Sequence, residues 1–248
     1  MSDIEIHVAN LSKQFPDIVA LDNVSMRFVN GNLYGVIGPA GAGKTTLFRI
    51  MLDLMRANSG SVVYYKNTKR IVFADVREHI AYMPQSQSLY ADLSVGEHLD
   101  FFRQLYGIDN REYLQKKSEL VRLARLQDFL DRPAGQLSGG MYKKLGLICA
   151  LLRSPQIMLL DEPTNGVDPI SRREFWDLLH DAQKQGILVI MSTAYMDEAE
   201  RCSAVVLMED GHVLATGAPQ QLLKQYNSKN FDELFLARAG GNDNVVDG

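Results

Sequence analysis

The sequence predicts an α/β fold with three parts: a core on a mixed or parallel sheet, an N-terminal antiparallel β portion, and an inserted α-helical subdomain. The first residues alternate between apolar and polar side chains, which is typical of half-buried strands. Further along, short apolar runs alternate with helical segments, as in a parallel sheet with crossover connections. Between these runs, residues 86–153 place leucines at helical spacings among many charges.

The N-terminal residues indicate two half-buried strands followed by a buried one. Apolar side chains occupy alternate positions from Ile4 to Val8 and again from Val24 to Phe28. The run LYGVIG, residues 33–38, is almost continuously apolar and is typical of a strand buried in a parallel sheet. A glycine-rich loop follows, and we expect a helix from Lys44 to about Met55.

The later residues complete the predicted core. Two more buried strands, IMLL and ILVIM, flank a helix that we expect from about Ile170 to Lys184. The stretch AVVLMEDGHVLATG indicates a hairpin that turns at Asp210-Gly211.

These elements divide the chain into a core, an insertion and a terminal segment. We assign residues 1–85 and 154–225 to the core, and residues 86–153 to the inserted helical subdomain. Residues 226–248 should form a C-terminal helix and a polar tail, which we expect to be mobile. The apolar face of that helix consists of Phe231, Leu234 and Phe235.

The composition excludes several classes of protein. The chain has 248 residues, enough for one domain that carries a subdomain. Its formal net charge of −4 argues against a broad phosphate-binding surface, so we expect no nucleic-acid partner. Cys149 and Cys202 lack metal-ligand spacing and fit a reducing compartment. We also expect a soluble chain, because it shows no signal-peptide pattern and no apolar run of about 18 to 20 residues.

The stretch GPAGAGKTT, Gly38 to Thr46, fits the phosphate-loop pattern G-x-x-x-x-G-K-[ST]. Its glycines let backbone N–H groups converge on phosphate oxygens, and the following helix adds its positive N-terminal end. Lys44 would reach the β- and γ-phosphates, and the Thr45 hydroxyl would ligate Mg²⁺. The alternative is an ordinary glycine turn with a solvated lysine, which the strand–loop–helix context disfavours. The sequence therefore predicts a P-loop NTPase core.

A second motif, LLDEP, ends an apolar strand in two carboxylates. Asp161 is placed to hold the magnesium, directly or through water. Glu162 is placed to orient and polarise a water for attack on the γ-phosphate. The alternative is an acidic strand end or helix cap, and by itself the motif is a weak signal.

A third motif, LSGGM, stands at the start of another helix, at residues 137–141. Ser138, Gly139 and Gly140 form a second candidate for an anion-binding helix N-terminus. The chain thus has two candidate phosphate-binding helix N-termini for one nucleotide, which raises the question of how both could serve it.

The motifs GPAGAGKTT, LSGGM and LLDEP, in this order and spacing, resemble the nucleotide-binding subunits of the ATP-binding-cassette (ABC) transporter family. The resemblance covers about Ile4 to Leu223, nearly the whole chain. It implies ATP and Mg²⁺ as cofactors and ATP hydrolysis coupled to transport. In the family, LSGG meets the nucleotide of the other protomer, so that two chains enclose two ATP molecules head to tail. The second anion site would then serve a second ABC ATPase subunit, in a homodimer or a heterodimer.

The resemblance also gives roles to residues outside the three motifs. Phe15 matches the aromatic residue that stacks on adenine, although a core aromatic is the alternative. Gln85, in YMPQ, matches the glutamine that senses magnesium and leads into the helical subdomain. Asp168, in TNGVDP, matches the aspartate that crosses the dimer interface, and it equally suits a helix N-cap before Pro169.

The resemblance thus implies three overlapping sets of site residues. The catalytic set is Glu162, Lys44 and Gln85, and the metal set is Thr45, Gln85 and Asp161. The nucleotide-binding set is Phe15, Gly38, Pro39, Ala40, Gly41, Ala42, Gly43, Lys44, Thr45, Thr46, Gln85, Ser138, Gly139, Gly140 and Asp168.

The stretches KKLGL, DEPTNGVDPISRREFW and FDELFLARAG are similar to those of bacterial exporter subunits of the drug-efflux type. Such subunits pair with a separate integral membrane permease, and the helical segment after Gln85 would cradle its coupling helix. The implied location is cytoplasmic, at the cytoplasmic face of the inner or plasma membrane. A rival is a non-transport cassette protein that acts on ribosomes or DNA. Such relatives usually carry two cassettes, coiled-coil insertions or basic arms, and this sequence shows none of these.

One position departs from the family pattern. The strand that corresponds to ILVIM normally leads to Ser-Thr-His, whose histidine contacts the γ-phosphate, whereas this chain has Ala194. Losing one donor to the transferring phosphate typically costs about 3–4 kcal/mol. We expect a slow but real ATPase, and the alternative is a degenerate or regulatory subunit that acts in a heterodimer. No substitute lies near that place in the motif order among His7, His79, His98, His180 and His212.

Overall fold

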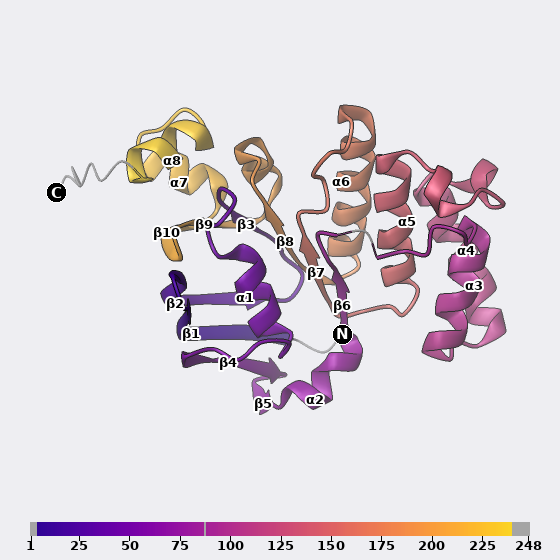
Figure 1. The fold of residues 1–248 in the computed structure, drawn as a ribbon, viewed down its shortest axis with the longest axis horizontal. Helices are drawn as coiled ribbons and strands as arrows, with labels where there is room; N and C mark the ends of the chain where they lie inside the picture. Colours follow the sequence, from indigo (N-terminus) through magenta and orange to yellow (C-terminus); the bar gives the residue numbers. More distant parts are fainter. Residues whose placement is uncertain (1–3, 87, 240–248) are drawn as a thin grey trace.

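The computed structural model describes residues 4–86 and 88–239, and two sheets organise them (Figure 1). The first sheet is antiparallel, with the strand order β2-β1-β4-β5. Alternate side chains of its long strands are buried, which confirms the predicted N-terminal antiparallel portion. Its strands are β1 (Ile4–Phe15), β2 (Ile18–Val29), β4 (Ser59–Lys66) and β5 (Lys69–Ile71).

The second sheet has six strands in the order β10-β9-β3-β8-β7-β6. All neighbours are parallel except the edge pair β9 and β10. Every residue of β3, β7 and β8 is buried, because helices and the first sheet cover both faces. The strands are β3 (Leu33–Ile37), β6 (Ile80–Met83), β7 (Ile157–Asp161), β8 (Leu188–Thr193), β9 (Ala204–Glu209) and β10 (His212–Gly217).

Helix α1 (Lys44–Met51) lies between the two sheets (Figure 1). Its Leu47 and Phe48 belong to one buried cluster with Phe28 of the first sheet and Leu159 of the second. This packing fixes the start of α1 beside the ends of the parallel strands. The helix ends at Met51, four residues before the expected Met55, because the chain turns to a positive φ of 54° at Asp53.

The inserted helices form a unit at one end of the molecule (Figure 1). They are α3 (Val95–Tyr106), α4 (Asn110–Leu123) and α5 (Gly139–Leu151), with short 3₁₀ turns at Gln127–Phe129 and Ala134–Gln136. Helix α5 contacts β6 and α6 (Pro169–Lys184), so this unit is joined to the core through α5. The arrangement confirms an α-helical portion between two core strands.

The remaining elements are an edge hairpin of the second sheet, two C-terminal helices and three short segments. The hairpin of β9 and β10 turns at Asp210-Gly211, as predicted, with positive φ at both residues. Helix α7 (Pro219–Gln225) was not expected, and α8 (Phe231–Ala239) is the expected C-terminal helix with Phe231 and Leu234 buried. The other short elements are α2 (Phe73–Val76) and the 3₁₀ segments Arg77–His79 and Met196–Arg201.

Three further expectations concern membrane-spanning segments, the two cysteines and the tail. Within residues 4–86 and 88–239, no helix is long and apolar enough to cross a membrane. Both cysteines, Cys149 and Cys202, are buried, and burial raises the pKa of each thiol well above its usual range. The polar tail predicted after the last helix, residues 240–248, lies outside the described residues.

Candidate functional site

The three central parallel strands bring two of the predicted motifs together at their carboxyl ends. In the register of these strands, Ile37 pairs with Thr193 and Asp161 pairs with Ser192. The N–H of Gly38, the first residue of the phosphate loop, donates to the Thr193 carbonyl at 3.1 Å. The glycine loop and the two carboxylates therefore lie side by side at the edge where α/β sheets bind ligands.

Backbone geometry makes glycine necessary in the loop. Gly43 has a φ of 98°, and a Cβ there would lie 2.3 Å from the Ala20 carbonyl oxygen. Gly43 also begins α1, which has no side-chain cap. The first N–H groups of α1 have no intrahelical acceptors, so they form an anion-binding helix end of the kind that phosphate occupies.

Lys44 is the buried cation of this loop, with 4% of its surface exposed. Its Nζ donates to the carbonyl oxygens of Gly38 at 2.7 Å and Pro39 at 2.9 Å, and lies 3.4 Å from Glu162 Oε1. Burial lowers the pKa of Lys44, and the nearby Glu162 carboxylate offsets part of that shift. Phosphate oxygens would replace these carbonyl partners with full negative charges, which suits an ammonium held in this position.

Asp161 ends β7 and is completely buried. Its Oδ1 accepts a hydrogen bond from Ser192 Oγ at 2.6 Å, while its Oδ2 has no hydrogen-bond partner in the structure. A buried carboxylate oxygen without a partner is costly unless a cation or water meets it. Such an oxygen is a suitable ligand for Mg²⁺, and the next residue, Glu162, lines the same pocket as Thr45.

Glu162 follows Asp161 and reaches the other side chains of the predicted catalytic set. Its Oε2 accepts from Gln85 Nε2 at 2.8 Å, and its Oε1 faces Lys44. Its backbone has a φ of 46°, and its N–H donates to the Ser192 hydroxyl at 2.9 Å. This left-handed backbone conformation is sparsely populated for residues other than glycine, so the hydrogen bond to Ser192 helps to hold it.

Lys44, Gln85 and Glu162 line one pocket of about 320 Å³. Phe15 stands at its rim, 38% exposed, where an aromatic ring is free to stack on a base, and it is not a core residue. The alternative of a core aromatic is therefore wrong. The described residues that line the pocket are Phe15, Ile18, Ala20, Ala40, Gly41, Ala42, Gly43, Lys44, Thr45, Thr46, Gln85 and Glu162.

The LSGGM residues lie outside this pocket and form a second group. Ser138 caps α5 by accepting from the Met141 N–H at 3.3 Å, and Ser138 and Gly139 are both exposed. Gly140 packs against α6, where a Cβ would lie 2.2 Å from the Cβ of Ser171. The two helix N-termini that the sequence offers as phosphate sites therefore do not line one pocket within this chain.

Asp168 belongs to this second group. It caps α6 by accepting from the N–H groups of Ile170 at 3.1 Å and Ser171 at 3.0 Å, as the helix N-cap interpretation predicts. These backbone donors lower the pKa of the Asp168 carboxyl.

Position 194 carries no functional group at the end of β8. Ala194 is exposed and follows Thr193, whose Oγ1 accepts from the Tyr195 N–H at 3.0 Å. No histidine is present among the described residues that line the pocket.

The sequence motifs missed several residues that hold the carboxylates. Ser192 contacts both Asp161 and Glu162, and Asn165 Nδ2 lies 3.4 Å from Glu162 Oε2. Lys143 of α5 donates to the Gln85 carbonyl at 3.3 Å. Ser192 and Asn165 lie within three residues of Ala194 and Glu162 in the sequence, and this proximity could have marked them as candidates. Only the fold shows which atoms they contact.

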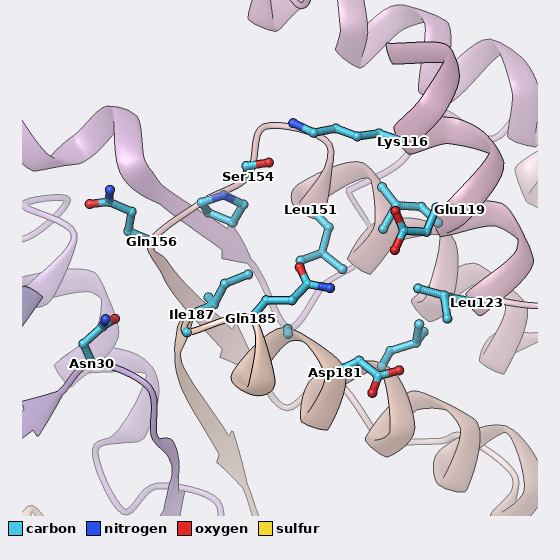
Figure 2. A pocket seen from close by; sticks show the side chains of 15 residues that line it. Asn30, Lys116, Glu119, Leu123, Leu151, Ser154, Gln156, Asp181, Gln185 and Ile187 are labelled. Atoms are coloured by element: carbon cyan, nitrogen blue, oxygen red, sulfur yellow. The ribbon is translucent and has the colours of Figure 1, made fainter. Parts of the chain in front are cut away.

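A second hollow of about 450 Å³ lies among α4, the end of α6 and the loop before β7 (Figure 2). Leu151 and Ile187 contribute to its lining, together with the carboxylates of Glu119 and Asp181. The carboxylates do not suit a polyphosphate, since like charges repel, and Lys116, which also lines the hollow, is paired with Glu112. The pocket beside Lys44 is therefore the candidate nucleotide site.

Replacing Lys44 with Ala should nearly abolish ATP binding, because no other group in the pocket supplies a buried cation at that place. Fluorescence titration with a labelled ATP analogue measures the affinity. Lys66→Ala, on strand β4 of the other sheet, is the matched control and should bind like the wild type. Unchanged affinity in Lys44→Ala would disprove the assignment of the phosphate loop.

Comparison with known proteins identifies the family. The ABC transporter family model matches residues 21–165. The chain is 40% identical, over 93% of its length, to the probable multidrug ABC transporter ATP-binding protein YbhF of Escherichia coli (strain K12), and spans 40% of that protein. It is 33% identical to the Nod factor export ATP-binding protein I of Sinorhizobium fredii, covering 97% of this chain and 69% of the relative.

Solved structures show the same relationship. An ATP-binding subunit of an ABC transporter superimposes with a TM-score of 0.81 and 29% identity, over 94% of this chain and 99% of the other. The chain therefore belongs to the ABC transporter family, among its ATP-binding components, a family that hydrolyses ATP to drive transport.

Proposed function

We propose that this chain is the ATP-binding and ATP-hydrolysing subunit of an exporter of the drug-efflux type, and that it drives a separate membrane permease. The observation that carries the proposal is the contact set of Glu162, which joins Lys44 of the phosphate loop to Gln85. The names of the two relatives, a probable multidrug transporter protein and a Nod factor export protein, support a role in export for this chain.

The chemistry follows from the positions of three groups. Lys44 and the N-terminal N–H groups of α1 hold the phosphates, as their charges and directions allow. Thr45, Gln85 and Asp161 would hold Mg²⁺, which would neutralise charge on the β- and γ-phosphates. Glu162 then orients and polarises the attacking water, with Gln85 fixing one carboxylate oxygen.

The position of the second anion site supports dimerisation. Ser138 and Gly139 are exposed and lie outside the Lys44 pocket, so they are available to a nucleotide held by another subunit. Two chains arranged head to tail would complete two sites, each with a phosphate loop from one chain and LSGGM from the other. Asp168 would lie near that interface.

The helical subdomain, which we place at residues 86–153, is the proposed contact with the permease. After Gln85 it exposes Tyr90, Phe101 and Leu105, which are apolar side chains of the kind that protein interfaces cover. Docking there would place the chain at the cytoplasmic face of the membrane.

Ala194 supports a second candidate function. A subunit without the imidazole would hydrolyse little ATP by itself and would act in a heterodimer, with its LSGGM completing a stronger site on the partner. We favour the active subunit, because Glu162 contacts both Lys44 and Gln85.

Glu162→Gln should keep ATP binding and lower turnover roughly 10²–10⁴-fold, the usual size of a lost general base. Phosphate release by the purified chain with Mg²⁺ measures this. Glu119→Gln, an exposed residue of α4, is the control and should leave turnover unchanged. Wild-type turnover in Glu162→Gln would remove Glu162 from the catalytic role.

Ser138→Arg should leave nucleotide binding by the isolated chain intact and stop ATP-dependent dimerisation, because Ser138 serves the opposite site. Size-exclusion chromatography in the Glu162→Gln background measures the dimer, since that variant retains ATP. Ser118→Arg, exposed on α4, tests the same change elsewhere in the subdomain and should still dimerise. Loss of binding by the Ser138→Arg monomer would contradict the head-to-tail arrangement.

Ala194→His should raise turnover of the purified chain, because it adds a donor to the transferring phosphate of the kind worth roughly 10²–10³ in rate. A smaller gain is expected if water or backbone already replaces part of that donor. Ala194→Leu adds bulk without a donor and should give no gain. Absence of Glu162-dependent turnover in the chain alone, with activity restored by a second cassette subunit, would favour the regulatory function instead.

A further inference from the structure

A chain of polar contacts leads from the residue after Ala194 to the proposed general base. Tyr195 donates its hydroxyl hydrogen to Asn165 Oδ1 at 3.4 Å, and Asn165 Nδ2 donates to Glu162 Oε2 at 3.4 Å. The same carboxylate oxygen accepts from Gln85 at 2.8 Å. Glu162 Oε2 therefore accepts from two amides, those of Gln85 and Asn165.

The chemistry of both neighbours fixes the direction of the Asn165 amide. Its NH₂ group faces a carboxylate, which only accepts hydrogen bonds, and its oxygen faces a phenolic O–H, which can donate. Reversing the amide would place two oxygen acceptors against each other at Glu162. The contacts thus form one directed sequence of donors that ends on the carboxylate.

Other contacts hold Tyr195 in place. The guanidinium of Arg172, from α6, lies over the Tyr195 ring at 5.2 Å from its centroid. Arg172 is in turn paired with Asp197 and lies 3.8 Å from the buried Glu198. The Tyr195 N–H also donates to Thr193 Oγ1, so both the ring and the backbone of this residue are restrained.

Glu198 also connects the two segments that carry the polar chain. Its Oε2 accepts from Thr164 Oγ1 at 3.1 Å, and its Oε1 accepts from Trp176 Nε1 at 3.1 Å. Thr164 is adjacent to Asn165, and Glu198 lies one 3₁₀ turn after Tyr195. This buried carboxylate keeps the turn after Glu162 beside the segment after β8.

We propose that Tyr195 is a positioning residue for ATP hydrolysis: acting through Asn165, it holds the Glu162 carboxylate in this orientation in a chain whose residue 194 offers only a methyl group. The inference depends on the proposed role of Glu162. Tyr195 does not contact Lys44 or the phosphate loop in the described structure, so it affects the turnover step and leaves nucleotide binding unchanged.

Steady-state hydrolysis by the purified full chain, with Mg²⁺ and varied ATP, tests the proposal. Tyr195→Phe removes one oxygen and keeps the ring under Arg172, so it should lower kcat about two- to tenfold at unchanged KM, the size of one neutral hydrogen bond. Tyr65→Phe, on strand β4 of the other sheet, is the matched control and should keep the wild-type kcat.

A double-mutant cycle tests the path through Asn165. Asn165→Ala should lower kcat, and adding Tyr195→Phe should cause no further loss, because the hydroxyl acts only through the amide. Equal and independent losses in the two backgrounds, or wild-type kcat in Tyr195→Phe, would overturn the inference.

The two proposals fail in different ways. Wild-type turnover in Glu162→Gln would overturn both the role of Glu162 and the role of Tyr195. Turnover that depends on Glu162, together with wild-type kcat in Tyr195→Phe, would overturn the role of Tyr195 alone.

Discussion

Ser192 Oγ donates to Asp161 at 2.6 Å and accepts from the N–H of Glu162 at 2.9 Å, so one hydroxyl on β8 holds both carboxylate residues at the end of β7. The two strands are parallel neighbours, and Asp161 pairs directly with Ser192. A shift of register by one residue would turn the carboxylates toward the opposite face of the sheet. The positions of the metal-binding oxygen and the general base therefore depend on this strand pairing.

Lys44 and Glu162 have protein partners for their charges in this pocket. Lys44 has two carbonyl partners and Glu162, and Glu162 has Lys44 and Gln85. An unpaired buried ammonium would be costly, and these partners reduce that cost. Nucleotide phosphates would compete with the carbonyls and with Glu162 for the same ammonium, which would free the carboxylate to meet water. Among the described residues of the site, Asp161 Oδ2 is a fully buried oxygen without a hydrogen-bond partner, and a cation would suit it.

The methyl group at position 194 changes how the end of β8 contributes to the site. Ser192 holds the backbone and the metal-binding carboxylate, and Tyr195 approaches the general base through Asn165. Both contributions are positional, since neither Ser192 nor Tyr195 is among the described residues that line the pocket beside Lys44. A site of this kind retains the orientation of its catalytic carboxylate while it lacks one donor to the transferring phosphate. Slow hydrolysis is the physical consequence that we expect.

The sequence by itself determined the family and the fold class, and it predicted the main binding residues. The phosphate-loop pattern requires glycines at fixed offsets and a lysine at the helix start, so residues 38–46 can be predicted to form a phosphate loop from the sequence. Apolar alternation and continuous apolar runs likewise distinguish the two sheets, because burial on one or two faces leaves different patterns. The helix end at Met51 and helix α7 were not predicted, since local turns at element ends give weak signals.

Only the tertiary structure decided which side chains meet. Glu162 and Gln85 are 77 residues apart, and Tyr195 and Asn165 are 30 apart, yet each pair is in hydrogen-bond contact. It also showed that Phe15 stands at a pocket rim and that Ser138 lies outside the Lys44 pocket. Such contacts depend on the order and register of the parallel strands and on the packing of α5 and α6 against them. Hydrophobic periodicity does not depend on the order of the strands in a sheet. The sequence therefore predicts which residues are functional, and the tertiary structure decides which of them are in contact.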